Sequence, residues 1–326
     1  MKLQILVPQY KETEEVIKPL LDSIEVQQNV NLKKDIGVII VNDGTNVRLS
    51  KKFLKRYSFP IEYHLHDHKG VSATRNACLD YATADYVMFC DADDMFYNAC
   101  GLYIVFNEIN NGGFDTLVSA FIEESHNPYT KEVNYINHEM DSVFVHGKVH
   151  NRKFLLDNNI RWNEDLTIHE DSYFNCLCQR LGKEVTYSPT SFYLWKWRDA
   201  SVCRHDPKYI LKTYNNMLDS STALIDQFIK RGRIEDAQFF ATNMIYDAYF
   251  TMNKDEWLNQ ENKEYRHNTE LRFKEYWITH KELHDSIPNE IKTQIIMGIK
   301  NRMYAEGMVL ETLTFNEWIK QVEAIK

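Results

Sequence analysis

The first ninety residues alternate between short apolar runs and stretches with helical periodicity. Apolar runs predict four strands, at residues 3–7, 36–41, 61–65 and 86–90. Apolar positions at helical spacing predict connecting helices, at residues 16–24, 49–57 and 70–82. Strands joined by helices imply a mostly parallel sheet with right-handed crossovers. Ligands bind such a sheet beyond the carboxyl ends of its strands.

The pattern changes twice farther along the chain. Residues 114–205 are less regular, with strand-like pieces at 116–121, 143–146, 185–187 and 192–197 and helical pieces at 151–157 and 171–181. From about residue 206 helical spacing dominates, as in residues 209–229, 234–252 and 291–308. We therefore predict an α/β domain over residues 1–205 and an α-helical C-terminal domain over residues 206–326.

Composition and charge narrow the class of protein. The net charge is −9, which argues against a general polyanion-binding surface. No run approaches the length of about 18 apolar residues that a membrane-spanning helix needs, and the six cysteines are scattered as in a reduced protein. We expect a globular protein without a transmembrane segment, located in the cytoplasm.

An acidic turn directly follows the fourth predicted strand. Asp91, Asp93 and Asp94 fall within four positions, and carboxylates this close repel one another unless a cation or hydrogen bonds compensate. Alternate carboxylates suit a hard divalent ion that keeps other positions for phosphate oxygens and water. An acidic turn exposed to solvent would have the same residue types, so the position at the end of a buried strand carries the argument.

Four segments stand in order along the chain, at residues 5–12, 38–45, 70–77 and 84–94. They are an opening strand and turn, an acidic turn after the second strand, a helix with an alanine–arginine–asparagine sequence, and the acidic turn at Asp91. Together they resemble glycosyltransferase family 2, the inverting transferases of GT-A fold, over roughly residues 2–205, and Lys11 stands where the family usually has asparagine. The resemblance implies a GT-A catalytic domain over residues 1–205.

The resemblance assigns the nucleotide end of the site. Pro8, Tyr10 and Glu12 would line the base pocket, with Tyr10 stacked on the pyrimidine. Asp43 would accept the uracil N3–H, although turn chemistry beside a glycine also accounts for this residue. Arg75 would lie near the diphosphate, or it would brace the acidic loop.

The resemblance also implies a metal site at the acidic turn. Asp91 would face the ribose or the metal, Ala92 would line the nucleotide-sugar site, and Asp93 would ligate Mn²⁺ or Mg²⁺. His205 would complete the metal shell, unless it is a surface histidine. Lys196 and Arg198 could touch the diphosphate once their segment folds over it.

An inverting transfer needs a base to take the proton of the acceptor hydroxyl. Residues 168–174 match the family's glutamate–aspartate pair at the start of a helix, which makes Asp171 the candidate base and Glu170 a ligand to the acceptor. A helix N-terminus favours the ionised carboxylate. An acidic helix cap would use the same residue types.

The prediction is therefore transfer of a sugar from a UDP-sugar to a hydroxyl of a glycan, a polymer, a protein or a modified nucleobase. Two alternatives keep the same fold: a DNA glycosyltransferase acting on hydroxymethylated bases, and a binding module without activity. A nucleotidyltransferase is disfavoured because residues 9–12 contain no glycine for a phosphate loop. The helical C-terminal domain could mediate a homo-oligomer.

Overall fold

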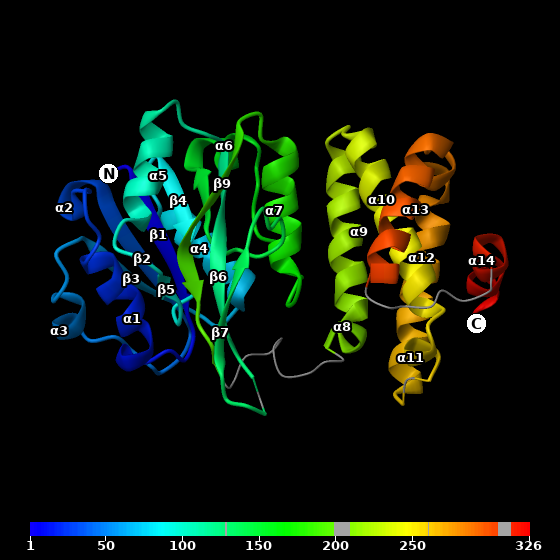
Figure 1. Ribbon diagram of the computed structural model, residues 1–326, viewed down its shortest axis with the longest axis horizontal. Coiled ribbons are helices and arrows are strands. Elements are labelled where there is room, and N and C mark those ends of the chain that lie inside the picture. Colours follow the sequence, from blue (N-terminus) through cyan, green and yellow to red (C-terminus); the bar gives the residue numbers. More distant parts are fainter. Residues whose placement is uncertain (128, 199–208, 260, 306–313) are drawn as a thin grey trace. The chain divides into compact units, whose positions relative to one another are not determined.

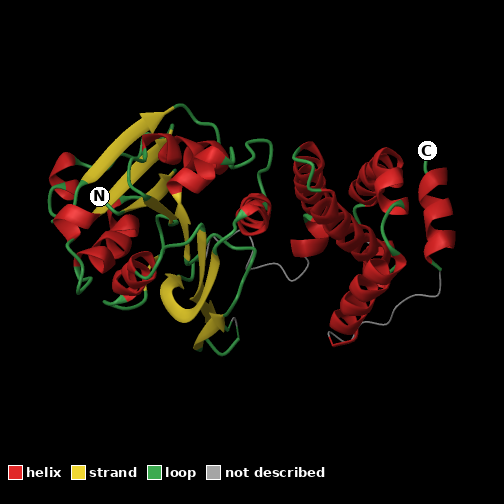
Figure 2. Ribbon diagram, turned by 90° about the horizontal axis from the view of Figure 1, so that it is seen from above, coloured by secondary structure: helices red, strands yellow, loops and turns green. Residues whose placement is uncertain are grey.

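The computed structural model describes residues 1–127, 129–198, 209–259, 261–305 and 314–326. The chain divides into two compact units, Met1–Val202 and Cys203–Lys326. The first unit is a sheet with helices on both faces, and the second unit is built of helices (Figures 1 and 2). The predicted α/β class with a helical C-terminal part is thus confirmed.

The predicted strands of the N-terminal segment form the parallel part of the sheet. They are adjacent in the order β3-β2-β1-β4, and each neighbouring pair is parallel. Their bounds are β1 Leu3–Gln9, β2 Ile36–Asp43, β3 Ile61–His66 and β4 Tyr86–Phe89. The helices between them are α1 Glu14–Glu25, α2 Leu32–Asp35, α3 Lys51–Leu54 and α4 Val71–Tyr81. Helix α3 is shorter than the predicted helical segment 49–57.

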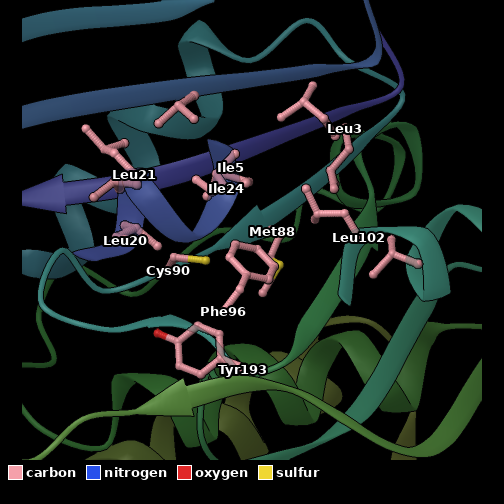
Figure 3. Packing of buried hydrophobic residues seen from close by; sticks show 14 of the residues in the cluster. Leu3, Ile5, Leu20, Leu21, Ile24, Met88, Cys90, Phe96, Leu102 and Tyr193 are labelled. Carbon is pink, nitrogen blue, oxygen red and sulfur yellow. The ribbon is translucent and has the colours of Figure 1, made fainter. Parts of the chain in front are cut away.

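Both faces of β1, β2 and β4 are buried, as their continuous apolar runs predict, whereas the edge strand β3 is only partly buried. Leu3, Ile5 and Val7 face the main hydrophobic cluster, to which α1 contributes Leu20 and Leu21. Figure 3 shows this packing, with Phe96 and Tyr193 closing the cluster from the later strands. The opposite face of β1 and β2 packs against α4. The ends of these strands are therefore held at fixed positions.

The remaining strands make the sheet mixed rather than mostly parallel. Strand β8 lies antiparallel between β4 and β6, β9 lies parallel to β6, and β5 and β7 are antiparallel edge partners. Their bounds are β5 Met95–Phe96, β6 Thr116–His126, β7 Val133–His138, β8 Lys148–Asn151 and β9 Val185–Trp195. The accompanying helices are α5 Gly101–Asn110, α6 Arg152–Asp157 and α7 Glu170–Leu181.

Three predictions for this part are wrong or incomplete. Residues 143–146 are bends rather than a strand, because α7 takes their backbone groups: Val145 N donates to Asp171 at 3.2 Å, and Val143 O accepts from Asn175 at 2.7 Å. The two pieces predicted at 185–187 and 192–197 are one strand, β9, with a register shift opposite Ser119. Elements β5, β7, β8 and α5 were not predicted.

The second unit consists of helices that pack through aromatic side chains. Tyr246, Phe250 and Ile299 form a buried cluster against which Phe315 packs. The helices are α8 Tyr209–Lys212, α9 Tyr214–Lys230, α10 Ile234–Met252, α11 Asp255–Leu258, α12 Lys263–Asp285, α13 Asn289–Ala305 and α14 Phe315–Ala324. Among the described residues, no helix combines the length and the apolar character needed to cross a membrane.

Candidate active site

Polar segments that follow β1, β2 and β4 meet at one edge of the sheet. These strands are adjacent and parallel, so the segments after Gln9, Asp43 and Phe89 lie side by side (Figure 1). This edge is where an open α/β sheet binds ligands. The predicted base, metal and nucleotide residues that the structure describes come from these strand ends, from α4, from the first turn of α7 and from the segment after β9.

Two residues with left-handed backbone set the start of α4 and α7. Gly70, which precedes α4, has φ +92°, and His169, which precedes α7, has φ +64°. Positive φ is uncommon for a residue with a side chain. These two turns place Arg75 of α4 opposite Glu170 and Asp171 of α7.

Arg75 is buried and joins three carboxylates that are remote in sequence. Its Nη1 donates to Glu170 Oε1 at 3.0 Å and to Asp171 Oδ1 at 2.8 Å, and its Nη2 donates to Asp91 Oδ1 at 3.0 Å. The guanidinium lies 4.4 Å from the centroid of the Trp162 ring. Burial alone would lower the pKa of Arg75, but the three carboxylates outweigh burial and raise it. These contacts brace the acidic turn against the start of α7, and the predicted position of Arg75 near the diphosphate stays a prediction.

Asp171 lies at the start of α7 and is partly buried, with its side chain 18% exposed. Its Oδ2 accepts the backbone N–H of Val145 at 3.2 Å. Burial raises the pKa of Asp171 to about 7; Arg75 opposes this shift, and the charges of Glu170 and Asp91 add to it. A carboxyl group that titrates near neutrality is suited to proton transfer.

Asp93 points toward a basic side chain from the segment after β9. Arg198 Nη1 donates to Asp93 Oδ2 at 2.6 Å and approaches Glu12 Oε1 at 3.4 Å. Glu12 in turn accepts the backbone N–H of Tyr10 at 2.8 Å. The Arg198 side chain is 42% exposed, so these pairs lie at the accessible rim of the edge.

The third carboxylate of the acidic turn, Asp94, is buried and braced. It accepts the hydroxyl of Tyr193 at 2.6 Å and the backbone N–H of Lys196 at 2.9 Å. Burial raises the pKa of Asp94 well above its usual value, and the charges of Asp93 and Asp91 add to the shift. Asp94 therefore ties the acidic turn to β9 and the residues after it.

Asp91, Asp94 and His146 form a group that could hold a metal ion, since one ligand atom from each lies within 4.8 Å of the others. Two carboxylates and an imidazole are ligands that Mn²⁺ accepts. Asp91 and Asp93 are the more accessible carboxylates, with side chains 32% and 20% exposed. Asp91, Asp94 and His146 thus fit a divalent cation, and the predicted ligand Asp93 is not part of this group but pairs with Arg198. The predicted ligand His205 lies outside the described residues.

The nucleotide end of the edge is formed by Tyr10, Asp43 and a short loop before α4. Tyr10 is 40% exposed, and His68 stacks on it with ring centroids 4.9 Å apart. Asp43 accepts the backbone N–H groups of Lys69 at 2.8 Å and Gly70 at 3.0 Å, and His68 Nδ1 lies 2.8 Å from its Oδ2. Asp43 therefore anchors the loop before α4 rather than the turn beside Gly44, and its predicted role toward uracil stays a prediction.

The other predicted residues lie close to this edge. Pro8 is partly buried in β1 opposite Val41, and Ala92 is buried within the acidic turn. Lys196 contributes its backbone N–H to Asp94.

Sequence reasoning missed several partners of the site. Trp162, Tyr193 and His68 were given no role, and Asp94 none beyond its charge. Asp94 had a visible signal, because it follows Asp91 and Asp93 directly. Trp162 meets the site from a distant segment, and nothing in its local sequence indicates this.

Comparison with solved structures shows the fold. S. aureus TarS aligns with 89% of this chain and 50% of its own, with a TM-score of 0.63 and 16% identity. TarS 1–349 in complex with UDP-GlcNAc aligns with 95% of this chain and 93% of its own, with a TM-score of 0.62 and 16% identity. These likenesses confirm the predicted GT-A fold class.

Comparison with known sequences identifies the family. Glycosyltransferase GlyA of Streptococcus pneumoniae is 28% identical over 228 residues, which are 62% of this chain and 32% of that protein. The uncharacterized glycosyltransferase EpsJ of Bacillus subtilis is 25% identical over 215 residues, 60% of each chain. The chain thus spans about a third of GlyA and three fifths of EpsJ. The model of "Glycosyl transferase family 2" matches residues 4–175, more than half of the chain. The chain belongs to glycosyl transferase family 2.

Proposed function

We propose that this chain is an inverting, divalent-metal-dependent glycosyltransferase that moves a sugar from a UDP-sugar to a hydroxyl acceptor. The observation that carries the proposal is the Arg75 cluster, because one buried guanidinium holds Asp91 of the acidic turn beside Asp171. A donor bound at the acidic turn would then lie next to a carboxylate able to accept a proton. The acceptor belongs to one of four classes: glycan, polymer, protein or modified nucleobase.

The donor would bind to the acidic turn and to the nucleotide end of the edge, which Tyr10, Asp43 and the loop before α4 form. TarS 1–349 has been solved with UDP and with UDP-GlcNAc, and we propose a donor of the same class here. Asp91 and Asp93 would hold Mn²⁺ or Mg²⁺, which when bound supplies Lewis-acid stabilisation to the departing diphosphate. Arg198 already pairs with Asp93 and would reach the same phosphate oxygens.

The acceptor end uses Asp171 and Glu170. The Asp171 carboxylate takes the proton of the acceptor hydroxyl as that oxygen attacks the anomeric carbon, and the bond from this carbon to the UDP oxygen breaks. Attack from the face opposite UDP inverts the anomeric centre. Arg75 holds both carboxylates in place, so that the base need not reorganise during the reaction.

We further propose that residues 1–205 form the catalytic domain and residues 206–326 a separate helical domain. The compact units Met1–Val202 and Cys203–Lys326 support this division. The boundary itself falls within residues 199–208, outside the described residues.

Replacing the base tests the proposal. Asp171→Asn should lower sugar transfer by about 10²–10⁴-fold and leave the binding of UDP with Mn²⁺ unchanged, because Asp171 belongs to the acceptor end. Transfer is measured as release of UDP across a panel of UDP-sugars and acceptors, and binding by calorimetry. The control is Asp165→Asn, an exposed carboxylate in the loop before α7. Full activity in Asp171→Asn would show that another group is the base.

A further inference from the structure

His68 makes two contacts at the nucleotide edge that together define a binding position. Its ring stacks on Tyr10, with centroids 4.9 Å apart and planes 25° from parallel. Its Nδ1 lies 2.8 Å from Asp43 Oδ2. The His68 ring is therefore a planar heteroaromatic group that stacks on a tyrosine and donates a hydrogen bond to a buried carboxylate.

A uracil ring would use the same two contacts. It is planar and can stack on an aromatic side chain, and its N3–H is a donor that a carboxylate accepts. Tyr10 and Asp43 stand at the ends of adjacent parallel strands, where ligands of such sheets bind. The imidazole of His68 thus makes the two contacts that a nucleobase would make, a ring stack on Tyr10 and a hydrogen bond to Asp43.

The two rings cannot share this position. Inserting a base between Tyr10 and His68 needs two stacking distances, about 7 Å in total, and the ring centroids are 4.9 Å apart. The Asp43 side chain is only 6% exposed, so the oxygen that faces His68 is the one a ligand could reach from this side. A base that binds Tyr10 and Asp43 together has to replace the imidazole.

We propose that His68 occupies the nucleobase position of the free protein and swings out when the nucleotide-sugar binds. This inference rests on the proposed function, because it takes Tyr10 and Asp43 as the base-binding groups. His68 is then a residue that sets nucleotide affinity: every binding event first breaks its stack on Tyr10 and its hydrogen bond to Asp43.

The loop around His68 allows the side chain to leave while the backbone stays. Asp43 accepts the backbone N–H groups of Lys69 and Gly70, and these bonds do not involve the imidazole. The His68 side chain is 59% exposed, so rotation about its side-chain bonds carries the ring into solvent. Asp43 Oδ2 then keeps its hydrogen bond from Gly70 and can accept a second one from a ligand in place of His68, without loss of the loop.

The experiment compares His68→Ala with the wild-type chain by titration calorimetry, using UDP and UMP in the presence of Mn²⁺. Removing one stack and one hydrogen bond that compete with the base should lower Kd on the order of fivefold for both nucleotides. Equal gains for UDP and UMP would place the effect at the base rather than at the phosphates. The matched control is His64→Ala, because His64 also stacks on a tyrosine, Tyr81, at 3.7 Å, away from Asp43.

Each outcome decides the inference. Tighter binding of both nucleotides by His68→Ala, with His64→Ala unchanged, supports it. Weaker or unaltered binding by His68→Ala overturns it, since His68 would then be a wall of the pocket or a bystander. If neither the wild-type chain nor His68→Ala binds UDP, the proposed function itself fails. Binding by His68→Ala alone would support both.

Discussion

The Arg75 cluster and the Asp43 cluster stand at the same edge of the sheet but are held together differently. In the first, one buried guanidinium donates hydrogen bonds to three carboxylates, of which Glu170 and Asp171 are 95 and 96 residues away in the chain. In the second, the buried carboxylate of Asp43 accepts hydrogen bonds from a loop only 25–27 residues away. Two of the donors are backbone N–H groups. The first depends on the assembled fold, and the second on a single loop.

This difference indicates which of the two clusters can change its contacts when a ligand binds. A buried ion pair that loses its partner leaves an uncompensated charge, so the Arg75 cluster has strong reason to stay intact. The loop bonded to Asp43 carries an exposed histidine whose contacts can be exchanged for those of a ligand. Under the proposed function, the rigid cluster serves the chemical step and the adaptable loop serves donor binding.

The largest effect expected is from Arg75→Ala, which tests whether the first cluster is needed for folding. Loss of the guanidinium leaves Asp91, Glu170 and Asp171 without their shared cation and should lower the free energy of unfolding by about 3–5 kcal/mol. The measurement is urea denaturation. Arg161→Ala is the control, because Arg161 pairs with the exposed Asp80 of the same helix α4 and should cost less than about 1 kcal/mol. Equal losses in the two variants would remove the distinction between the clusters.

A smaller loss of stability is expected from Gly44→Ala, which tests how closely the second cluster is packed. Gly44 has φ +70°, and a Cβ there would lie 2.3 Å from the backbone N of His68. Gly232 has φ +69° with open space around it, so Gly232→Ala measures the backbone strain alone, about 1–2 kcal/mol. Gly44→Ala should cost about 1–3 kcal/mol more by thermal unfolding and weaken UDP binding. Identical costs would mean that the loop shifts freely.

The smallest effect expected is a shift in the pH dependence of activity, which tests whether the pKa of Asp171 in the first cluster controls the rate. The base must be ionised, and the pKa of Asp171 is about 7, so kcat/KM should fall about tenfold per pH unit below that value and level off above it. The charge of Glu170 raises the pKa of Asp171, so Glu170→Gln should move the rising limb to lower pH. Glu184→Gln, an exposed change after α7, should not move it. A limb that stays in place in Glu170→Gln would mean that Asp171 is not the titrating group.

Prediction from the sequence was accurate where local pattern decides structure. The apolar runs of β1, β2 and β4 are buried on both faces and bounded by turn residues, so neighbours in the chain specify each strand. Residues 143–146 look like a strand by the same criterion, but side chains of α7 take their backbone groups. Elements β5 and β7 were not predicted because their pairing with β9 and β6 gives them their structure.

The order of the motifs was enough to indicate the family, the acidic turn and Asp171, because each depends on a few adjacent residues. Only the tertiary structure decided what those residues touch. Arg75 had two possible roles in the sequence, and its partners Glu170 and Asp171 come from a helix nearly a hundred residues away. The contact of His68 with Tyr10 and Asp43 likewise needs three segments to meet. Burial and charge are properties of the assembled edge, which is why the sequence could name the residues and only the fold could pair them.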